Sequence, residues 1–445
     1  MAMLTAVAPE RSTFIAPVTL SGTQTIRKSV YALTDQEVQN YRLAVYRIAQ
    51  ISALGAQDNR GYQYVAGIHG QPGRYCKHHV PAFAIWHRPF MQGYEQRLQD
   101  FVPEVFVPYW DWTTRRAEQE GIPSIFTHAT WDNPDTGKTE PNPLLSQPKT
   151  LIGGGATSRD PRPSSDLVPL RDLIHSALLA PDYDSFAADL ENPHDQLHVW
   201  AGGDLSVIAF AAYDPLFWSH HCFVEYVLCQ WQDAHTEATA PVIDPRDFAP
   251  FSITIDDVWN YRKLGYSYLP DNASDLQVTG LPVGPGAATA NQLRSGVAVA
   301  NFPLYAIDLA FNRAELRFDG LTPPEDSFAV RVFAGVDKAS ANTPTNQNPH
   351  YLGTRYFFGH GECGGAPGHC DPIPRDIYDL RPHHHYAPLQ VRLDVTRRLR
   401  SLIQNKPADA PPNGDAPVTL VVIDRDGNEI SESELHFEGL SVVVR

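Results

Sequence analysis

Apolar and polar positions follow two different rhythms, one before residue 270 and another after residue 300. In the first part, Val38, Tyr41, Val45 and Ile48 recur at the three- and four-residue spacing of a buried helix face. The preceding segment 34–37, Thr-Asp-Gln-Glu, has the capping-box pattern, with threonine at the cap and glutamate three residues later. The pattern therefore predicts a helix that begins near residue 35.

Three further helices are predicted in this part, near residues 82–98, 192–200 and 215–232. The last begins with Pro215, and proline is favoured in the first turn of a helix. Residues 118–170 are rich in Pro, Gly, Ser and Asp, and we expect a long loop there.

After residue 300 the apolar positions alternate, as in half-buried strands. Phe328, Val330 and Val332 alternate in this way, and segments 389–395, 418–423 and 440–444 are also β-rich, with a turn at Asp426-Gly427. The Pro- and Gly-rich stretch 271–299 reads as a linker. We therefore predict an α+β chain: a mainly helical core with a four-helix bundle (1–270), a linker (271–299) and an antiparallel β-sandwich domain (300–445).

The charge balance narrows the range of partners. With 35 Lys and Arg against 51 Asp and Glu, the formal charge is −16, which disfavours nucleic acid and anionic membranes and favours a neutral small molecule; the alternative is that the acidity only keeps the protein soluble. The sequence contains no uninterrupted apolar run of about 18 residues, so we expect no membrane-spanning helix. The first 20 residues show no secretory signal, so the cytoplasm is the default location.

The chain has five cysteines, and because this number is odd they cannot all pair in disulfides. Cys222 and Cys229 lie seven apart in a predicted helix, which separates their α-carbons by about 10 Å, too far for a disulfide. We expect both to be buried free thiols.

Histidines form the candidate chemistry. His194 and His198 are four residues apart and therefore lie on one face of a predicted helix. Downstream, His220 and His221 lie near the start of the next predicted helix. Upstream, three histidines follow one another at intervals of nine residues: His69, His78 and His87. Six imidazoles from four helices can converge inside a bundle. Imidazole ligands suit copper, zinc, iron or nickel, but zinc hydrolases usually add a carboxylate. Two facing three-histidine sites with open positions favour redox copper.

The residues around these histidines carry a family resemblance. His78-His-Val-Pro-Ala-Phe-Ala-Ile-Trp-His87 resembles the copper A signature of type 3 copper proteins: tyrosinases, catechol oxidases and molluscan hemocyanins. Asn192-Pro-His194-Asp-Gln-Leu-His198 with the later Asp214-Pro-Leu-Phe-Trp-Ser-His-His221 resembles their copper B signature. The resemblance implies two copper ions that bind dioxygen as co-substrate, one held by His69, His78 and His87, the other by His194, His198 and His221. It places His220 behind these ligands, in support.

The resemblance also implies roles for nearby residues. Cys76, at the Cys-x-His spacing of fungal tyrosinases and hemocyanins, is expected to form a thioether to His78; a free buried thiol is the alternative. Glu191 lies where the family has a glutamate proposed to hold a base. Asp195 replaces the usual asparagine and either shares that role or is a first-turn residue favoured by the helix dipole. Ile208 corresponds to a residue at the copper entrance, or is an ordinary buried aliphatic.

Two further features depart from the common pattern or lie outside it. Where the family usually has Asp-Arg after the last histidine, this chain has Glu225-Tyr226, which changes the support of the ligands. A second cluster, with His360, Cys363, His369, Cys370 and the triplet at 383–385, is either a metal or copper-loading site or a disulfide-closed loop with exposed histidines.

The resemblance implies a phenol oxidase that converts o-diphenols to o-quinones, with monophenols or o-aminophenols as further substrates. The alternative is an oxygen carrier of the hemocyanin type, and a zinc-bound structural protein is a third reading. A single copper unit favours the enzyme, because hemocyanin chains usually contain several units. The expected partners are a small phenolic substrate and a copper-loading helper protein.

In this family the β domain covers the copper entrance and inserts one apolar or aromatic residue. Tyr356, Phe357 and Phe358 are the candidates here. We therefore predict a latent enzyme, activated by cleavage between about Pro270 and Phe302. The alternative is that the β domain only stabilises the core.

Overall fold

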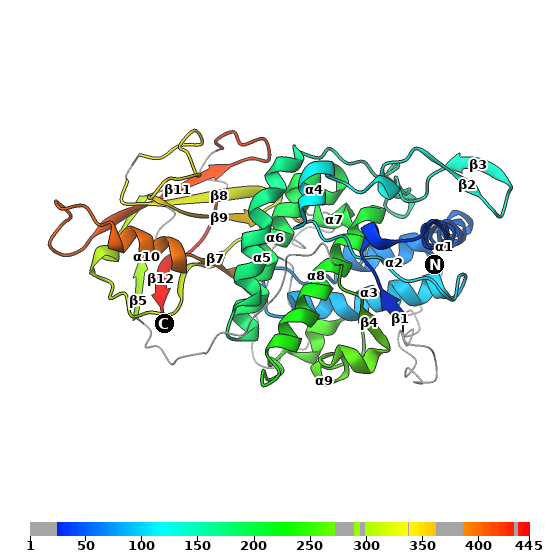
Figure 1. Cartoon of the computed structure of the whole chain (residues 1–445), viewed down its shortest axis with the longest axis horizontal. Coiled ribbons are helices and arrows are strands. Elements are labelled where there is room, and N and C mark those ends of the chain that lie inside the picture. Colours follow the sequence, from blue (N-terminus) through cyan, green and yellow to red (C-terminus); the bar gives the residue numbers. More distant parts are fainter. Residues whose placement is uncertain (1–24, 272–288, 294–298, 337, 362–385, 431–434) are drawn as a thin grey trace, which may run out of the picture.

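The chain is described by a computed structural model covering residues 25–271, 289–293, 299–336, 338–361, 386–430 and 435–445. Figure 1 shows a helix-rich part and a strand-rich part side by side; α5 and α6 lie where the helix-rich part meets the sheets, and α10 lies within the strand-rich part. The helices are α1 (Asp35–Leu54), α2 (Tyr62–His69), α3 (Phe83–Gln99), α4 (Arg115–Glu120), α5 (Val168–Leu178), α6 (Tyr183–Ala201), α7 (Ile208–Ala211), α8 (Pro215–Ala234), α9 (Ile255–Val258) and α10 (Thr396–Gln404).

The strand-rich part contains two four-stranded antiparallel sheets with the orders β10-β7-β12-β5 and β6-β11-β8-β9. Side chains of both sheets, such as Phe318 and Val330, share one buried apolar core. The strands are β1 (Thr25–Arg27), β2 (Thr130–Asn133), β3 (Lys138–Pro141), β4 (Tyr266–Tyr268), β5 (Thr289–Leu293), β6 (Val299–Phe302), β7 (Ala314–Leu321), β8 (Phe328–Ala334), β9 (Tyr351–Phe357), β10 (Leu389–Asp394), β11 (Ala416–Ile423) and β12 (Gly439–Val444).

Local sequence signals account for several helix starts. The capping box at Thr34 and Glu37 is confirmed, since each side chain bonds the other residue's backbone N–H. Asp214 caps α8 by accepting from the backbone N–H of Leu216, and Pro215 occupies the first helical position. Such caps satisfy N–H groups that have no partner inside the helix.

Two expectations need correction. α6 begins at Tyr183, nine residues before the predicted start, and contains Pro193 in its interior. Nearly all of α6 is buried, so its first half shows no amphipathic period. Residues 118–170 are not one loop, because β2 and β3 form a hairpin there and Trp131 is buried beneath it.

The predicted linker also contains structure at its end. β5, at residues 289–293, pairs with β12 and forms an edge of the first sheet. Residues 272–288, the Pro- and Gly-rich centre of that stretch, lie outside the described residues.

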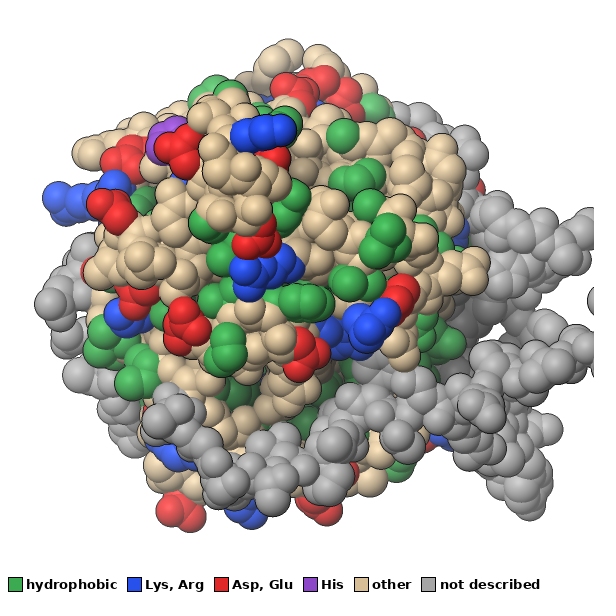
Figure 2. Space-filling model, turned by 90° about the vertical axis from the view of Figure 1, so that its right-hand side faces the viewer, with side chains coloured by type: hydrophobic (Ala, Val, Ile, Leu, Met, Phe, Trp, Pro, Cys, Tyr) green, Lys and Arg blue, Asp and Glu red, His purple; other side chains and the backbone are tan. Residues whose placement is uncertain are grey.

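The helical end of the molecule carries mixed charge. On the part of this face that the structure describes, acidic and basic side chains are interspersed with scattered apolar ones (Figure 2). The described part of this face therefore shows no stripe of basic side chains of the kind that binds nucleic acid. Among the described residues, no helix is both long and apolar enough to cross a membrane.

Candidate metal centre

Six buried histidines converge in the helical part. We call His69, His78 and His87 the first trio, and His194, His198 and His221 the second trio. The first trio comes from the end of α2, the loop before α3, and α3. The second trio comes from α6 and α8. All six side chains are at most 6% exposed.

One of the six histidines does not lie on a helix, although all six were expected to come from four helices. His78 lies in the loop between α2 and α3, where Arg74 (φ 53°) and His79 (φ 56°) adopt the left-handed conformation. A non-glycine residue rarely takes this conformation, and it is incompatible with a continuing α-helix. Strained positions of this kind gather at functional sites.

The second trio has the geometry of a metal site. The three Nε2 atoms are separated by 3.1 Å (His194–His198), 3.3 Å (His194–His221) and 3.4 Å (His198–His221). Nitrogens bound at 2.0–2.1 Å around a tetrahedral ion would be about 3.3–3.4 Å apart. The three nitrogens therefore fit one ion with its fourth position open.

The first trio faces the second trio. The Nε2 atoms of His69 and His78 are 3.3 Å apart, and the ring of His87 lies 5.4 Å from each of theirs between centroids. The Nε2 of His87 is buried without a hydrogen-bond partner among the described residues. The rings of His87 and His221 stack at 4.5 Å, so the two trios lie against each other and suit two neighbouring ions.

Hydrogen bonds behind the rings orient three of these histidines. The Nδ1–H groups of His87 and His198 donate to the carbonyls of Phe83 (2.8 Å) and Leu205 (2.7 Å), and that of His194 donates to Asp195 (3.0 Å). This arrangement leaves each Nε2 lone pair free for a metal. Burial lowers the pKa of every ring in the two trios, so all six are neutral, as ligands must be.

The two predicted carboxylates lie beside the trios. Glu191 accepts from the backbone N–H of His79 at 2.5 Å and lies 3.6 Å from Nδ1 of His78, a member of the first trio. Burial alone would raise the pKa of Glu191, but His79 and His78 hold it well below its usual range. Burial raises the pKa of Asp195 to about 7, against the lowering effects of His79 and Arg355. Glu191 therefore gives up its proton readily, whereas Asp195 retains its proton more strongly than usual. Glu191 lies beside the first trio and Asp195 beside the second.

Two further side chains contact these carboxylates and were not predicted from the sequence. His79 lies with Glu191 and Asp195 in one buried group whose side-chain atoms are within 4.8 Å. Arg355 reaches them from β9 and lies 3.2 Å from Asp195 and 3.0 Å from Nδ1 of His79. The His78-His79 doublet was a local signal for the first, but nothing near Arg355 in the sequence pointed to a partner 160 residues away.

The remaining predicted residues are also near the trios. Cys76 is a free thiol, and its sulphur lies within 4.8 Å of a ring nitrogen of both His69 and His78. The backbone N–H of Ile208 donates to the carbonyl of Gly359 at 2.9 Å. The ring of His220 packs on His194 and His198 at 5.0 and 4.7 Å.

Of the three aromatic candidates, Phe358 reaches the metal centre. Its ring stacks on His198 at 4.1 Å and 13°, and meets His78 edge-on at 5.5 Å. Phe357 packs instead on Phe328 in the core of the strand-rich part. Tyr356 lines a separate pocket. Phe358, which is fully buried, therefore fills the space beside both trios, and we call it the plug.

Among the described residues, four ion pairs join the helical part to the strand-rich part that carries the plug. We call them the docking seam: Arg313–Asp189 (2.8 Å), Arg355–Asp195 (3.2 Å), Arg425–Asp160 (3.0 Å) and Arg445–Asp182 (3.3 Å). The amide of Asn192 adds two bonds to the edge strand β9, one to the carbonyl of Thr354 and one from the N–H of Tyr356, each at 3.0 Å.

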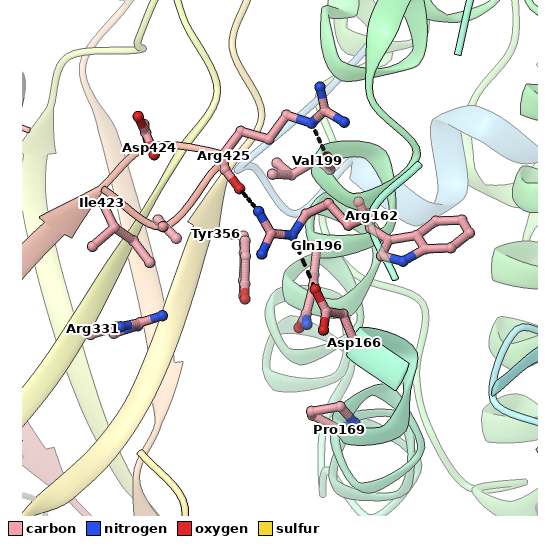
Figure 3. Close-up of a pocket in the computed structure, with 13 residues that line it drawn as sticks. Arg162, Asp166, Pro169, Gln196, Val199, Arg331, Tyr356, Ile423, Asp424 and Arg425 are labelled. Atoms are coloured by element: carbon pink, nitrogen blue, oxygen red, sulfur yellow. Dashed lines mark hydrogen bonds and ion pairs between the residues drawn. The ribbon is translucent and has the colours of Figure 1, made fainter. Parts of the chain in front are cut away.

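A pocket of ≈ 240 Å³ lies along the docking seam (Figure 3). Arg162 and Gln196 line its helical side, and Tyr356 and Arg425 line the opposite side. Arg162 donates to the carbonyl of Arg425, and Arg425 donates to the carbonyl of Val199 at 3.2 Å. Polar contacts, among them the buried pairs Arg313–Asp189 and Arg355–Asp195, therefore help to join the two parts.

The departure at residue 225 is compensated within the helical part. Glu225 accepts from Arg88 (2.9 Å) and from the hydroxyl of Tyr266 (2.8 Å), and it pairs with Arg27 of β1 at 3.4 Å. Burial disfavours its charge, but Arg88 and Arg27 hold the pKa of Glu225 below its usual value. This network joins α3 to α8, the helices that carry His87 and His221. Cys222 and Cys229 are buried free thiols, as predicted.

In the second cluster, Cys363, His369, Cys370 and the histidine triplet at 383–385 lie outside the described residues, whereas His360 is described and buried.

Residues 59–234 match the family model described as the common central domain of tyrosinase. Over 224 residues the chain is 32% identical to hemocyanin 2 of Megathura crenulata, covering 47% of this chain and 6% of that protein. It is 26% identical over 260 residues to the tyrosinase of Streptomyces lincolnensis, covering 52% of this chain and 90% of that protein.

Solved structures extend the likeness to the strand-rich part. A functional unit of octopus hemocyanin has a TM-score of 0.62 at 20% identity, covering 94% of this chain and 99% of that one. A tyrosinase from Burkholderia thailandensis has 0.61 at 20% identity, covering 94% and 100%. An oxygen-bound pro-tyrosinase mutant of Aspergillus oryzae has 0.61 at 16%, covering 96% of each chain. The fold is thus shared by tyrosinases and hemocyanins.

Proposed function

We propose that this chain, which belongs to the type 3 copper protein family, is a latent phenol oxidase that converts o-diphenols to o-quinones with dioxygen. The observation that carries the proposal is the pair of facing trios, whose neutral rings fit two metal ions with open positions. Bound copper would supply the two-electron chemistry of dioxygen. Two o-diphenols and one dioxygen would give two o-quinones and two waters.

The carboxylates favour an enzyme over a carrier. Oxidation of an o-diphenol releases two protons, whereas reversible dioxygen binding releases none. Glu191 and Asp195 lie behind the rings of His78 and His194, on the Nδ1 side, and would accept the released protons from there. A phenol has a pKa near 10, so a proton acceptor is needed most for monophenols. We assign both carboxylates to proton transfer, with Asp195 also orienting His194.

Latency follows from the position of the plug. The ring of Phe358 occupies the site against His198 that a substrate ring would need. The chain is pinned there by the backbone bond from Ile208 to Gly359 and by the hydroxyl of Ser327, which donates to the carbonyl of Ser206 at 2.6 Å. A phenol is too large to pass such a buried ring, whereas dioxygen is small. The likeness to a pro-tyrosinase fold supports the same reading.

A hemocyanin-like dioxygen carrier is the second candidate. The sequence relative at 32% identity is a hemocyanin, and the trios and the plug suit reversible binding of a small gas equally well.

A substrate panel separates the two candidates. We expect the copper-loaded chain, cut within residues 272–288, to oxidise catechol, and an o-aminophenol or tyrosine more slowly. The measurement is steady-state dioxygen uptake with quinone absorbance, with the uncut chain as the control. Cut protein that binds dioxygen but forms no quinone from any of the three would support the carrier.

A thioether between Cys76 and His78 is expected in copper-loaded protein. The sulphur already lies close to the ring, and burial raises the pKa of the Cys76 thiol to about 12, so it is not a reactive thiolate in the metal-free chain. Closing the bond removes two hydrogens, with dioxygen at the copper centre as the oxidant. Mass spectrometry of tryptic peptides should show the two residues linked and lighter by two hydrogens. Stoichiometric alkylation of Cys76 in active protein would exclude the bond, and Cys222 serves as the buried control thiol.

A further inference from the structure

A fourth histidine lies within reach of the second trio. One ring nitrogen from each of His194, His198, His220 and His221 lies within 4.8 Å of the others, and His220 is only 1% exposed. A metal ion held by four protein ligands has no open position, whereas one held by three can accept a further ligand. Whether His220 binds the metal therefore decides whether this half of the centre can react.

The hydrogen-bond partner of His220 differs in kind from those of the ligands. The ligands His87 and His198 direct Nδ1 at a carbonyl, and His194 directs it at a carboxylate. An acceptor at Nδ1 places the ring proton there and leaves Nε2 with a lone pair. His220 instead directs Nδ1 at the indole N–H of Trp112, at 3.0 Å.

An indole N–H can only donate, so Nδ1 of His220 must be the acceptor and carries no proton. The proton of the neutral ring is then on Nε2, which has no lone pair to offer a metal. Nε2 of His220 is also buried with no hydrogen-bond partner among the described residues, so no second hydrogen bond there competes for the position of the ring proton. Trp112 is itself fully buried and packs on the ring of His220 at 5.9 Å.

We propose that Trp112 is a positioning residue that keeps His220 from binding the metal, and so keeps the second trio three-coordinate and open. The inference rests on the proposed function, since it concerns the metal held by the second trio. The group behind the ring is an acceptor for His194 and His198 and a donor for His220, whereas Nδ1 of His221 has no hydrogen-bond partner among the described residues. Trp112 acts through His220 and touches neither metal nor substrate.

The test is zinc binding by the full chain, measured by competition with a chromophoric chelator. In Trp112→Phe the donor is lost, so His220 can move its proton to Nδ1 and offer Nε2 as a fourth ligand. We expect one of the two zinc sites to bind roughly 10- to 100-fold more tightly, the range over which groups behind a ligand change metal affinity. The added substitution His220→Gln should return the affinity to that of the unaltered chain.

Two controls make the outcome decisive. Trp110→Phe removes the same ring system from a fully buried position two residues away, where the indole donates to the hydroxyl of Tyr31 at 3.1 Å, and should leave zinc affinity unchanged. His220→Gln alone should also leave it unchanged, which tests that His220 is not a ligand in the unaltered chain even if Trp112→Phe does not fold. Unchanged affinity in folded Trp112→Phe, or tenfold weaker binding in His220→Gln, would overturn the inference. An unaltered chain that fails to bind two zinc ions would instead contradict the proposed function.

Discussion

The Phe358→Ala variant is expected to oxidise catechol about 30-fold faster than the unaltered, uncut chain. The plug is fully buried against His198 and His78, and burial of such a ring contributes about 2 kcal/mol to the closed state. Since each 1.4 kcal/mol is a factor of about ten, its loss raises the accessible population about 30-fold. Initial rates of quinone formation in copper-loaded protein measure the effect.

The control for this variant is Phe333→Ala. Phe333 is a fully buried ring in β8 that packs on Tyr351 and contacts neither trio. Its loss destabilises the strand-rich part without opening the space beside His198. If both variants were activated equally, general loosening would be the cause. If Phe358→Ala bound dioxygen but gained no turnover, the plug would not be the barrier.

Loss of one ligand should have a larger effect still. In His198→Ala the second trio keeps two nitrogens, so that ion binds weakly and copper falls from two per chain to about one. The charge-transfer absorption of the dioxygenated dicopper centre should disappear completely, because it requires both ions. His87→Ala should do the same from the first trio. Metal analysis and absorption spectroscopy in air measure both outcomes.

The matched control is His235→Ala. His235 lies at the end of α8, bonds the carbonyl of Trp231 at 2.9 Å, and is separated from His221 by roughly 20 Å of helix. It should keep two coppers and the full absorption. Far-ultraviolet circular dichroism would show whether His198→Ala keeps its helices. A folded His198→Ala that retained the absorption would exclude His198 as a ligand.

Local chemistry could be predicted from the sequence where residues close in the chain act together. The cap at Thr34, the start of α8 at Pro215 and the strands β8 and β11 all follow from local patterns, and the structure contains them, although both strands are buried along nearly their whole length rather than at alternate residues. The spacing of the histidines is local as well, and the two trios form. The amphipathic pattern did not predict the first half of α6, because a helix that is buried on nearly every side has no polar face.

Contacts between distant segments could not be predicted in the same way. The approach of Arg355 to Asp195 depends on how β9 docks on α6, as does the choice of Phe358 over Phe357 and Tyr356. The loop position of His78 follows from left-handed residues at 74 and 79, which are an arginine and a histidine and therefore give no sequence signal. β5 was missed because an edge strand pairs on one side only and need not alternate strongly.

The central claim is that this is an oxidase held closed, and one single-turnover experiment tests it most directly. Copper-loaded protein, cut within residues 272–288, is dioxygenated, freed of excess dioxygen and mixed with catechol, while the charge-transfer absorption and quinone are followed together. We predict that the absorption disappears as quinone forms in proportion to the dicopper centres, and that the uncut chain keeps its absorption for much longer. An absorption that persists beside catechol in the cut protein, and that vacuum alone removes, would contradict the claim and identify a dioxygen carrier.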